Sequence, residues 1–276
     1  MTGLPALAIV GFGAMGRAIA LGLLGRGFVT PGKMFVAEPD GGKRAEAASL
    51  GMTAVESPRE AAEHLRAVES FPAARVVLVA VKPQLLDAVA ESLQPVTRAW
   101  PYTAISILAG VTTERIEAAL PGARVVRAMP NLGVRVGLGC TAVCAGRTAR
   151  PDDIATARGV FGALGMCMDL SESLMDAFTA VAGSGPAYAF LLAEAMEQGA
   201  REVGFTPEQA RTMVSQTLRA AAALLDGADP ADLRRAVTSK GGTTEAALGV
   251  LDQAGVRDAF ARAIIAARDR GHALNG

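Results

Sequence analysis

Three glycines near the start of the chain, Gly11, Gly13 and Gly16, are spaced to hold a phosphate group. The apolar run at residues 7–10 before them predicts a buried strand, and apolar residues at helical spacing follow over residues 14–24. A strand, a glycine turn and a helix in this order are the context that the dinucleotide fingerprint G-x-G-x-x-G requires. Such a turn can bind a pyrophosphate through the backbone N–H groups at the N-terminus of the helix.

Each glycine has its own task in such a turn. Gly11 permits the tight turn, Gly13 lets the pyrophosphate approach the backbone because it has no Cβ, and Gly16 lets the helix pack closely on the strand. The spacing alone is weak in a chain with 31 glycines, and a tight-packing turn is the alternative. The flanking elements favour dinucleotide binding, and we expect cofactor contacts along the whole turn: Gly11, Phe12, Gly13, Ala14, Met15 and Gly16.

The end of the next predicted strand, Met34–Ala37, carries residues that could choose between NAD and NADP. Glu38 lies about 20 residues beyond the glycine turn, where an acidic side chain accepts hydrogen bonds from the adenosine ribose in NAD enzymes. Lys43 and Arg44 follow closely and could instead pair with a 2′-phosphate. A solvated loop is the alternative for all three, so the sequence leaves the cofactor open as NADPH or NADH.

Further strand ends are candidate cofactor contacts, because ligands in open α/β sheets bind beyond the carboxyl ends of the strands. The β-branched run at residues 75–81 predicts a parallel strand buried on both faces, and a second strand is predicted at residues 103–108. We expect cofactor contacts from residues near these ends and in the segment R-A-M-P-N at 127–131: Val81, Lys82, Pro83, Ala109, Met129, Pro130 and Asn131. Lys82 could equally be a surface charge.

The elements that position these residues alternate between strand and helix up to about residue 170, which predicts a doubly wound, mainly parallel sheet. From Ser171 onward the sequence has no convincing strand pattern. We therefore expect an α/β protein in which residues 1–170 form a Rossmann-type domain and residues 171–276 form an all-α domain. Capping residues predict four helix starts: Ser57, Thr112, Thr206 and Asp229.

The composition limits the partners and the compartment. Of the 276 residues 51% are hydrophobic, and 27 Lys and Arg balance 27 Asp and Glu, so there is no electrostatic footprint for nucleic acid. No apolar run is long enough for a membrane span, and no basic segment suggests a signal peptide. Three cysteines favour reduced thiols over disulfides or a metal site. We expect a cytoplasmic protein without metal that acts on a small molecule.

The helices of the second domain are more apolar than one small bundle needs, which predicts a largely buried homodimer interface. Three signatures make the assignment more specific: R-A-M-P-N at 127–131, A-G-S-G-P-A-Y at 182–188 and R-A-V-T-S-K-G-G-T-T-E-A-A-L at 235–248. With these, the chain resembles the pyrroline-5-carboxylate reductase family over nearly its whole length. Many members have Pro at the position of Lys240, but Gly241, Gly242 and both threonines are in place.

The resemblance implies a Rossmann domain joined to a helical dimerisation domain, often assembled into larger rings of dimers. It implies that NAD(P)H reduces Δ1-pyrroline-5-carboxylate to proline, the last step of proline synthesis. It places Gly183, Ser184 and Gly185 near the substrate and the dimer seam, where a helix-packing kink is the alternative reading. It also places a threonine that matches Thr244 at the ring nitrogen of the substrate.

The glycine turn before Thr244 fits such a role, because backbone N–H groups at a helix start can bind a carboxylate. An N-cap at Thr243 or Thr244 is the alternative from the residues alone. We expect Thr244 to be the catalytic residue. The substrate-binding residues we expect are Gly183, Ser184, Gly185, Ser239, Gly241, Gly242, Thr243 and Thr244.

The implied reaction asks little of acid–base side chains. A protonated cyclic imine is already an electrophile, so the protein mainly aligns donor and acceptor, holds the carboxylate and excludes water. This agrees with a chain that has only 2 histidines, His64 and His272, neither of which is well placed as a base.

Two other functions compete with this reading. A β-hydroxyacid dehydrogenase needs a base, commonly a lysine on a helix of the second domain, whereas Lys240, the only lysine after residue 170, lies in a glycine turn. A non-catalytic dinucleotide sensor would keep the first glycine turn but would have no need for the turn at residues 239–244.

Overall fold

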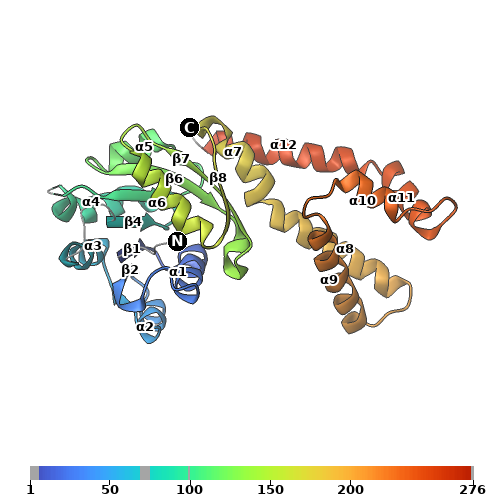
Figure 1. The fold of residues 1–276 in the computed structure, drawn as a ribbon, viewed down its shortest axis with the longest axis horizontal. Coiled ribbons are helices and arrows are strands. Elements are labelled where there is room, and N and C mark those ends of the chain that lie inside the picture. Colours follow the sequence, from blue (N-terminus) through green and yellow to red (C-terminus); the bar gives the residue numbers. More distant parts are fainter. Residues whose placement is uncertain (1–5, 69–74, 99, 275–276) are drawn as a thin grey trace. The chain divides into compact units, whose positions relative to one another are not determined.

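A computed structural model describes residues 6–68, 75–98 and 100–274 of the chain (Figure 1). The chain forms two compact units, of which the first comprises Met1–Gly183 with Ala267–Gly276 and the second comprises Ser184–Ala266. The predicted boundary at residue 170 rests on the change in sequence character and stays a prediction.

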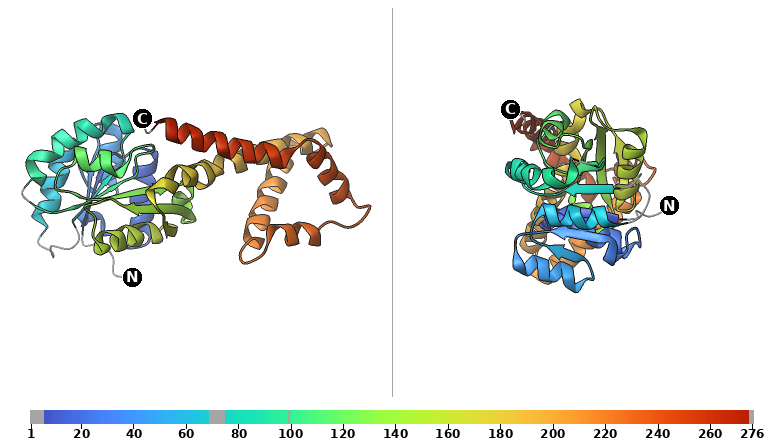
Figure 2. Two further views of the ribbon diagram at one scale, coloured as in Figure 1. Left: turned by 90° about the horizontal axis from the view of Figure 1, so that it is seen from above. Right: turned by 90° about the vertical axis from the view of Figure 1, so that its left-hand side faces the viewer.

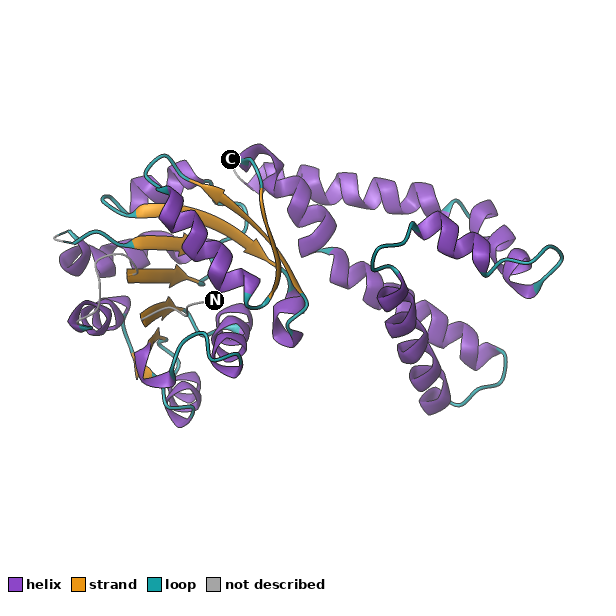
Figure 3. Ribbon diagram, viewed as in Figure 1, coloured by secondary structure: helices purple, strands orange, loops and turns teal. Residues whose placement is uncertain are grey.

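The first unit is built on an eight-stranded sheet in the order β3-β2-β1-β4-β5-β6-β7-β8. Strands β1 to β6 run parallel, β7 is antiparallel to β6, and β8 is parallel to β7. This confirms the predicted mainly parallel, doubly wound sheet. The strands, orange in Figure 3, are β1 (Ala6–Val10), β2 (Met34–Ala37), β3 (Thr53–Val55), β4 (Arg75–Val79), β5 (Thr103–Ser106), β6 (Arg124–Pro130), β7 (Gly139–Ala145) and β8 (Gly165–Asp169).

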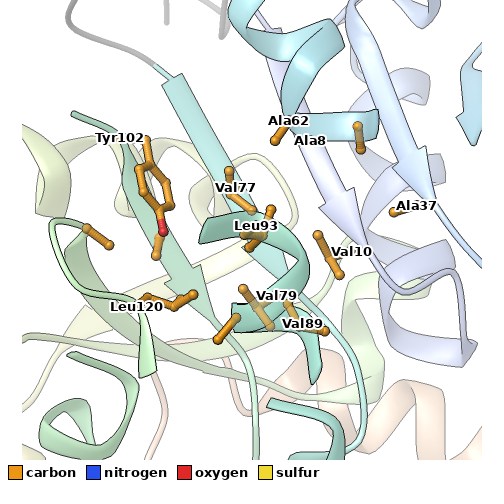
Figure 4. Close-up of a cluster of buried hydrophobic side chains, with 14 of the residues drawn as sticks. Ala8, Val10, Ala37, Ala62, Val77, Val79, Val89, Leu93, Tyr102 and Leu120 are labelled. Carbon is orange, nitrogen blue, oxygen red and sulfur yellow. The ribbon is translucent and has the colours of Figure 1, made fainter. Parts of the chain in front are cut away.

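Helices cover both faces of this sheet (Figure 2). They are α1 (Ala14–Gly25), α2 (Gly41–Ser49), α3 (Pro58–Ala67), α4 (Leu86–Thr97), α5 (Thr113–Ala119) and α6 (Pro151–Gly162). Successive strand residues point to opposite faces, so Ala8 and Val10 pack with α3, α4 and α5, whereas Leu7 and Ile9 pack with α1, α2 and α6. Figure 4 shows part of the first cluster, where Val77, Val79 and Leu93 lie together. Burial on both faces explains the uninterrupted apolar strands.

The segment after β8 is not one continuous α-helix. It comprises a 3₁₀ turn (Glu172–Leu174), the short helix α7 (Met175–Phe178) and a π-helical turn (Thr179–Gly183). The helical segment is interrupted between Gly183 and Gly185, and the turn before the interruption is wider than an α-helix. The side chain of Asn131, the residue after β6, binds the Ala182 carbonyl at this turn, as described below.

The second unit contains α8 (Gly185–Glu202), α9 (Pro207–Leu224), α10 (Pro230–Ala236), α11 (Thr243–Gln253) and most of α12 (Val256–Leu274). No strand occurs in residues 184–266, as predicted. Only Ala210 and Val214 of the described residues in this unit are buried, while Phe190, Leu191 and Val250 are more than half exposed. A helical unit with so little core needs further apolar burial for stability.

The four predicted helix caps are confirmed, because the side chains of Ser57, Thr112, Thr206 and Asp229 accept hydrogen bonds from the first turns of α3, α5, α9 and α10. Among the helices that the structure describes, none has the length and apolar character needed to cross a membrane.

Candidate active site

The turn between β1 and α1 has the geometry that a dinucleotide requires. Gly11 has a positive φ of 99°, and a Cβ there would lie 2.6 Å from the Ala80 carbonyl oxygen. A Cβ at Gly16 would collide with the carbonyl oxygen of Gly11, so α1 packs against the turn only because Gly16 is glycine. A Cβ at Gly13 would meet no atom within 4 Å. The space beside Gly13 is thus open for a ligand to approach the backbone.

The start of α1 is suited to an anion. The N-cap of α1 is Gly13, and no side chain of the described residues forms a capping hydrogen bond there. The first turn of α1 contains no acidic residue. The N–H groups of Ala14, Met15 and Gly16 have no partner inside the helix, since the first intrahelical bond comes from Arg17 to the Gly13 carbonyl. The residues present therefore fit a pyrophosphate.

A pocket of about 490 Å³ opens beside this turn, at the carboxyl ends of β1, β2 and β4. The strand order reverses at β1, so the pocket lies at the topological switch point of the sheet, where such folds bind their ligands. It brings together five of the predicted cofactor residues: Gly11, Gly13, Glu38, Val81 and Lys82. Its apolar wall includes Pro39, Pro58 and Leu85.

The other predicted cofactor residues lie outside the lining of this pocket. The Phe12 side chain is buried in the core, and Met15 packs against the same cluster. Pro83 opens a 3₁₀ turn, Pro83–Leu85, after Lys82, and Ala109 is exposed beyond the end of β5. Met129, Pro130 and Asn131 are at the end of β6, farther along the same edge of the sheet. Their contacts with a cofactor stay predictions.

Glu38 is not part of a solvated loop, because its side chain is buried. Its Oε2 accepts the Phe12 N–H at 2.8 Å and its Oε1 accepts the Asp40 N–H at 3.1 Å. The Lys43 Nζ lies 3.8 Å from Oε1, and the Arg44 guanidinium donates to the backbone carbonyls of Glu38 and Pro39. Glu38 thus ties the end of β2 to the glycine turn.

Asn131 connects the end of β6 with two other segments. Its Nδ2 donates to the Ala182 carbonyl at 3.0 Å, and its Oδ1 accepts the N–H groups of Gly133 at 3.1 Å and Cys140 at 3.0 Å. The side chain of Met129 lies next to Gly183, where an added Cβ would be 3.3 Å from the Met129 Cε. These bonds fix the strand end against the π-helical turn.

A buried ion cluster beside β6 escaped the sequence analysis. Arg127 is only 2% exposed, and its guanidinium lies 3.2 Å from Glu172 and 3.4 Å from Asp176. Glu172 also accepts the N–H and the hydroxyl of Thr113, and the His272 Nδ1 lies 3.0 Å from the other oxygen of Asp176. An arginine within the apolar run of β6 was the one available sign, since its partners lie about 50 residues away in the sequence.

The turn at residues 239–244 has a different cap from the one considered above. The N-cap of α11 is Gly242, so the alternative of an N-cap at Thr243 or Thr244 is wrong. The Gly241 N–H donates to the Glu245 carboxylate at 2.7 Å, and the Gly242 N–H donates to the Ser239 carbonyl at 3.0 Å. Thr243 and Thr244 are the first two helical residues, whose N–H groups have no intrahelical partner.

The cysteines show no sign of nucleophilic or metal chemistry. All three are free, and burial raises the pKa of the Cys144 and Cys167 thiols to about 11. No group of three His, Cys, Asp or Glu side chains in the described parts of the chain could hold a metal ion.

Comparisons with known proteins agree with this architecture. A family model described as "Pyrroline-5-carboxylate reductase dimerisation" matches residues 172–274, and one described as "NADP oxidoreductase coenzyme F420-dependent" matches residues 6–110. A pyrroline-5-carboxylate reductase from Synechocystis is 37% identical over 97% of both chains, and one from Mycobacterium tuberculosis is 35% identical over 99% of this chain and 97% of the relative.

Solved structures give the same result. A pyrroline-5-carboxylate reductase from Coxiella burnetii superimposes with a TM-score of 0.85 at 32% identity and covers 99% of both chains. The pyrroline carboxylate reductase from Plasmodium falciparum with NADP bound has a TM-score of 0.86 at 23% identity over the full length of both chains, which shows the fold.

The fold and the open glycine turn at the switch point define an oxidoreductase of the Rossmann type that uses a nicotinamide dinucleotide. The matches over almost the whole length narrow this class further. The chain belongs to the pyrroline-5-carboxylate reductase family, and its helical region is the dimerisation domain of that family.

Proposed function

We propose that this protein reduces the C=N bond of Δ1-pyrroline-5-carboxylate with a hydride from NADH or NADPH and so forms proline. The observation that carries the proposal is the uncapped start of α11 at Thr243 and Thr244, in a chain 37% identical to a curated pyrroline-5-carboxylate reductase. A dinucleotide sensor would need the open turn at Gly13 but not this second helix start.

When bound, the reduced nicotinamide supplies two electrons and a proton as hydride to the imine carbon. In our proposal the N–H groups of Ala14, Met15 and Gly16 hold the pyrophosphate. Lys82, at the mouth of the same pocket, adds positive charge beside it. The backbone N–H groups are fixed by α1 before the ligand arrives, so they bind the pyrophosphate at little entropic cost.

For the substrate end, we assign the carboxylate to the N–H groups of Thr243 and Thr244. The Gly241 N–H is already bonded to Glu245, which restricts the predicted anion site to the first residues of α11. The Thr244 hydroxyl accepts the iminium N–H of the substrate and holds the nitrogen in position while the carbon is reduced. The nitrogen keeps its proton and becomes an amine, so no side chain has to act as a general base.

Gly183, Ser184, Gly185 and Ser239 complete the proposed substrate-binding set. Gly183 ends the π-helical turn next to the Met129 side chain. A larger residue at this position would fit only if the side chain of Met129 or Thr179 shifted. We also propose that the protein acts as a homodimer that assembles into rings of dimers in the manner of its family. In our proposal it works in the cytoplasm, where its three free thiols stay reduced.

The test is to follow the absorbance of the reduced nicotinamide with pyrroline-5-carboxylate as the oxidant, using NADH and NADPH in parallel. Turnover that forms proline with either cofactor supports the proposal. Cofactor binding without turnover would support a sensor, and oxidation of 3-hydroxy acids with NAD(P)⁺ in its place would support a β-hydroxyacid dehydrogenase. A Thr244→Ala variant is the internal control, since it should lose reduction and keep cofactor binding.

A further inference from the structure

We propose that the pocket at the end of β2 selects NADH over NADPH and that Glu38 is the residue that selects it. The inference rests on the proposed function only in placing the adenosine half of a nicotinamide dinucleotide in this pocket. Membership of the family alone leaves the cofactor preference of this chain open.

The Glu38 carboxylate is fixed at the wall of the pocket rather than mobile. It is 6% exposed, and each of its oxygens accepts one backbone N–H, from Phe12 at 2.8 Å and from Asp40 at 3.1 Å. A carboxylate has about four lone-pair sites, so acceptor capacity remains on the side that lines the pocket. A pair of ribose hydroxyl groups can donate to this capacity without displacing either N–H bond.

A 2′-phosphate would meet an unfavourable charge at the same place. The Lys43 ammonium is already paired with Glu38 at 3.8 Å. The pocket lining as a whole is balanced, with Glu38 and Glu56 opposite Lys43 and Lys82. A phosphate dianion beside the buried carboxylate would therefore have to compete with Glu38 for Lys43, and burial strengthens the repulsion between like charges.

Arg44 is the residue best suited by chemistry to bind a phosphate, because a guanidinium can donate two parallel hydrogen bonds. Its Nη1 instead donates to the carbonyl oxygens of Glu38 at 2.9 Å and Pro39 at 2.5 Å. The guanidinium thus supports the loop that carries Glu38. These bonds occupy Nη1, so a 2′-phosphate would have to be bound through Nε and Nη2 of a side chain that is already held to the loop.

The experiment titrates the full-length protein with NADH and with NADPH in the absence of substrate and follows the nicotinamide fluorescence. We expect NADH to bind at least about tenfold more tightly. Adenosine fragments with and without a 2′-phosphate, used as competitors, should show the same order, because they reach only the adenosine end. Equal or tighter binding of NADPH would overturn the proposal.

Two variants connect the preference to Glu38. Glu38→Gln should shift the ratio of affinities toward NADPH by about tenfold, because it removes the charge that repels the phosphate. Lys43→Ala keeps both N–H bonds to Glu38, and we expect NADH to remain the tighter ligand in this variant. If Lys43 were instead part of a phosphate site, the variant would lose affinity for NADPH selectively. Lys33→Ala, an exposed lysine outside the pocket, is the matched control for loss of positive charge.

Binding and turnover separate this inference from the proposed function. Tighter binding of NADH in a protein that does not reduce pyrroline-5-carboxylate would contradict the proposed function and support the role of Glu38. Turnover with a preference for NADPH in both binding and rate would support the function and refute the selection by Glu38.

Discussion

The side-chain amide of Asn131 donates a hydrogen bond to the carbonyl oxygen of Ala182 at 3.0 Å, across 51 residues of sequence. The same side chain accepts two backbone N–H groups, from Gly133 and Cys140. Asn131 was predicted as a cofactor contact, but all of these bonds hold the protein to itself. Its side chain thus joins the carboxyl end of β6 to the π-helical turn that ends at Gly183.

An Asn131→Asp variant should separate this positioning role from direct cofactor binding. The carboxylate can still accept the two N–H groups, but it places a negative oxygen against the Ala182 carbonyl. We expect a loss of about 1–3 kcal/mol in the free energy of unfolding, typical of a hydrogen bond whose acceptor is left without its partner. We also expect a raised KM for pyrroline-5-carboxylate with an unaltered Kd for the cofactor. A weakened cofactor with a normal KM would mean that Asn131 contacts the cofactor itself.

A substitution at Gly13 in the glycine turn should weaken cofactor binding without affecting folding. Gly13 has φ −71° and ψ −171°, an extended conformation that any residue adopts, and a Cβ there meets nothing within 4 Å. Gly13→Ala should therefore fold with a normal melting temperature and bind the dinucleotide at least about tenfold more weakly, because the methyl group occupies the path of the pyrophosphate. Isothermal titration and thermal unfolding measure the two quantities.

Two further glycines serve as controls for this variant. Gly16→Ala should lower the melting temperature, since its Cβ would collide with the Gly11 carbonyl. Gly25→Ala, at the end of α1 with no atom within 4 Å of the added Cβ, should alter neither quantity. Normal cofactor affinity in Gly13→Ala would show that the binding site lies elsewhere.

Features of this fold that depend on residues close in the sequence could be predicted, whereas features that depend on distant residues could not. The caps at Thr112 and Thr206 involve neighbours within a few residues, and the three glycines follow a fixed spacing, so residue type and spacing were sufficient. The alternative of an N-cap at Thr243 or Thr244 fails, because Gly242 adopts the N-cap conformation and leaves both threonines inside the helix. The π-helical turn depends on Asn131, and a pattern along residues 172–183 has no access to that contact.

Thr244 gives a test of the substrate end. Thr244→Ala should fold, because alanine is the better helix former and the N-cap of α11 is Gly242. We expect kcat/KM for pyrroline-5-carboxylate to fall by at least about tenfold, roughly 1.4 kcal/mol of transition-state stabilisation, with an unchanged cofactor Kd. Thr244→Ser keeps the hydroxyl and should restore most of the rate. Equal rates in the alanine and serine variants would leave the hydroxyl without a role.

The ion cluster at Arg127 should be much more important to stability than a surface pair. Arg127→Met leaves Asp176 and Glu172 without their buried guanidinium partner, and such a loss typically costs about 3–5 kcal/mol. Arg59→Met removes an exposed pair with Glu63 on α3 and should cost less than about 1 kcal/mol. Urea unfolding of both variants measures the difference, and similar midpoints would contradict it.

The cysteines give a prediction of pH dependence. Burial raises the pKa of the Cys144 thiol to about 11 and that of Cys167 to about 11, so the native protein favours the neutral thiol. The thiolate is the reactive form, and an unfolded cysteine has a pKa of about 8.5. Iodoacetamide at pH 8 should therefore modify both residues slowly in the native protein and rapidly in urea, as mass spectrometry of the digested protein would show.

The same shift affects stability with a definite sign. A folded-state pKa above the unfolded value means that the unfolded chain loses its proton first as the pH rises. The contribution to stability is present below about pH 8.5 and is lost between there and about pH 11. A Cys144→Ala variant lacks this group, so its melting temperature should fall less steeply than that of the wild type from pH 8 to pH 10. Parallel slopes would show that burial does not hold this thiol neutral.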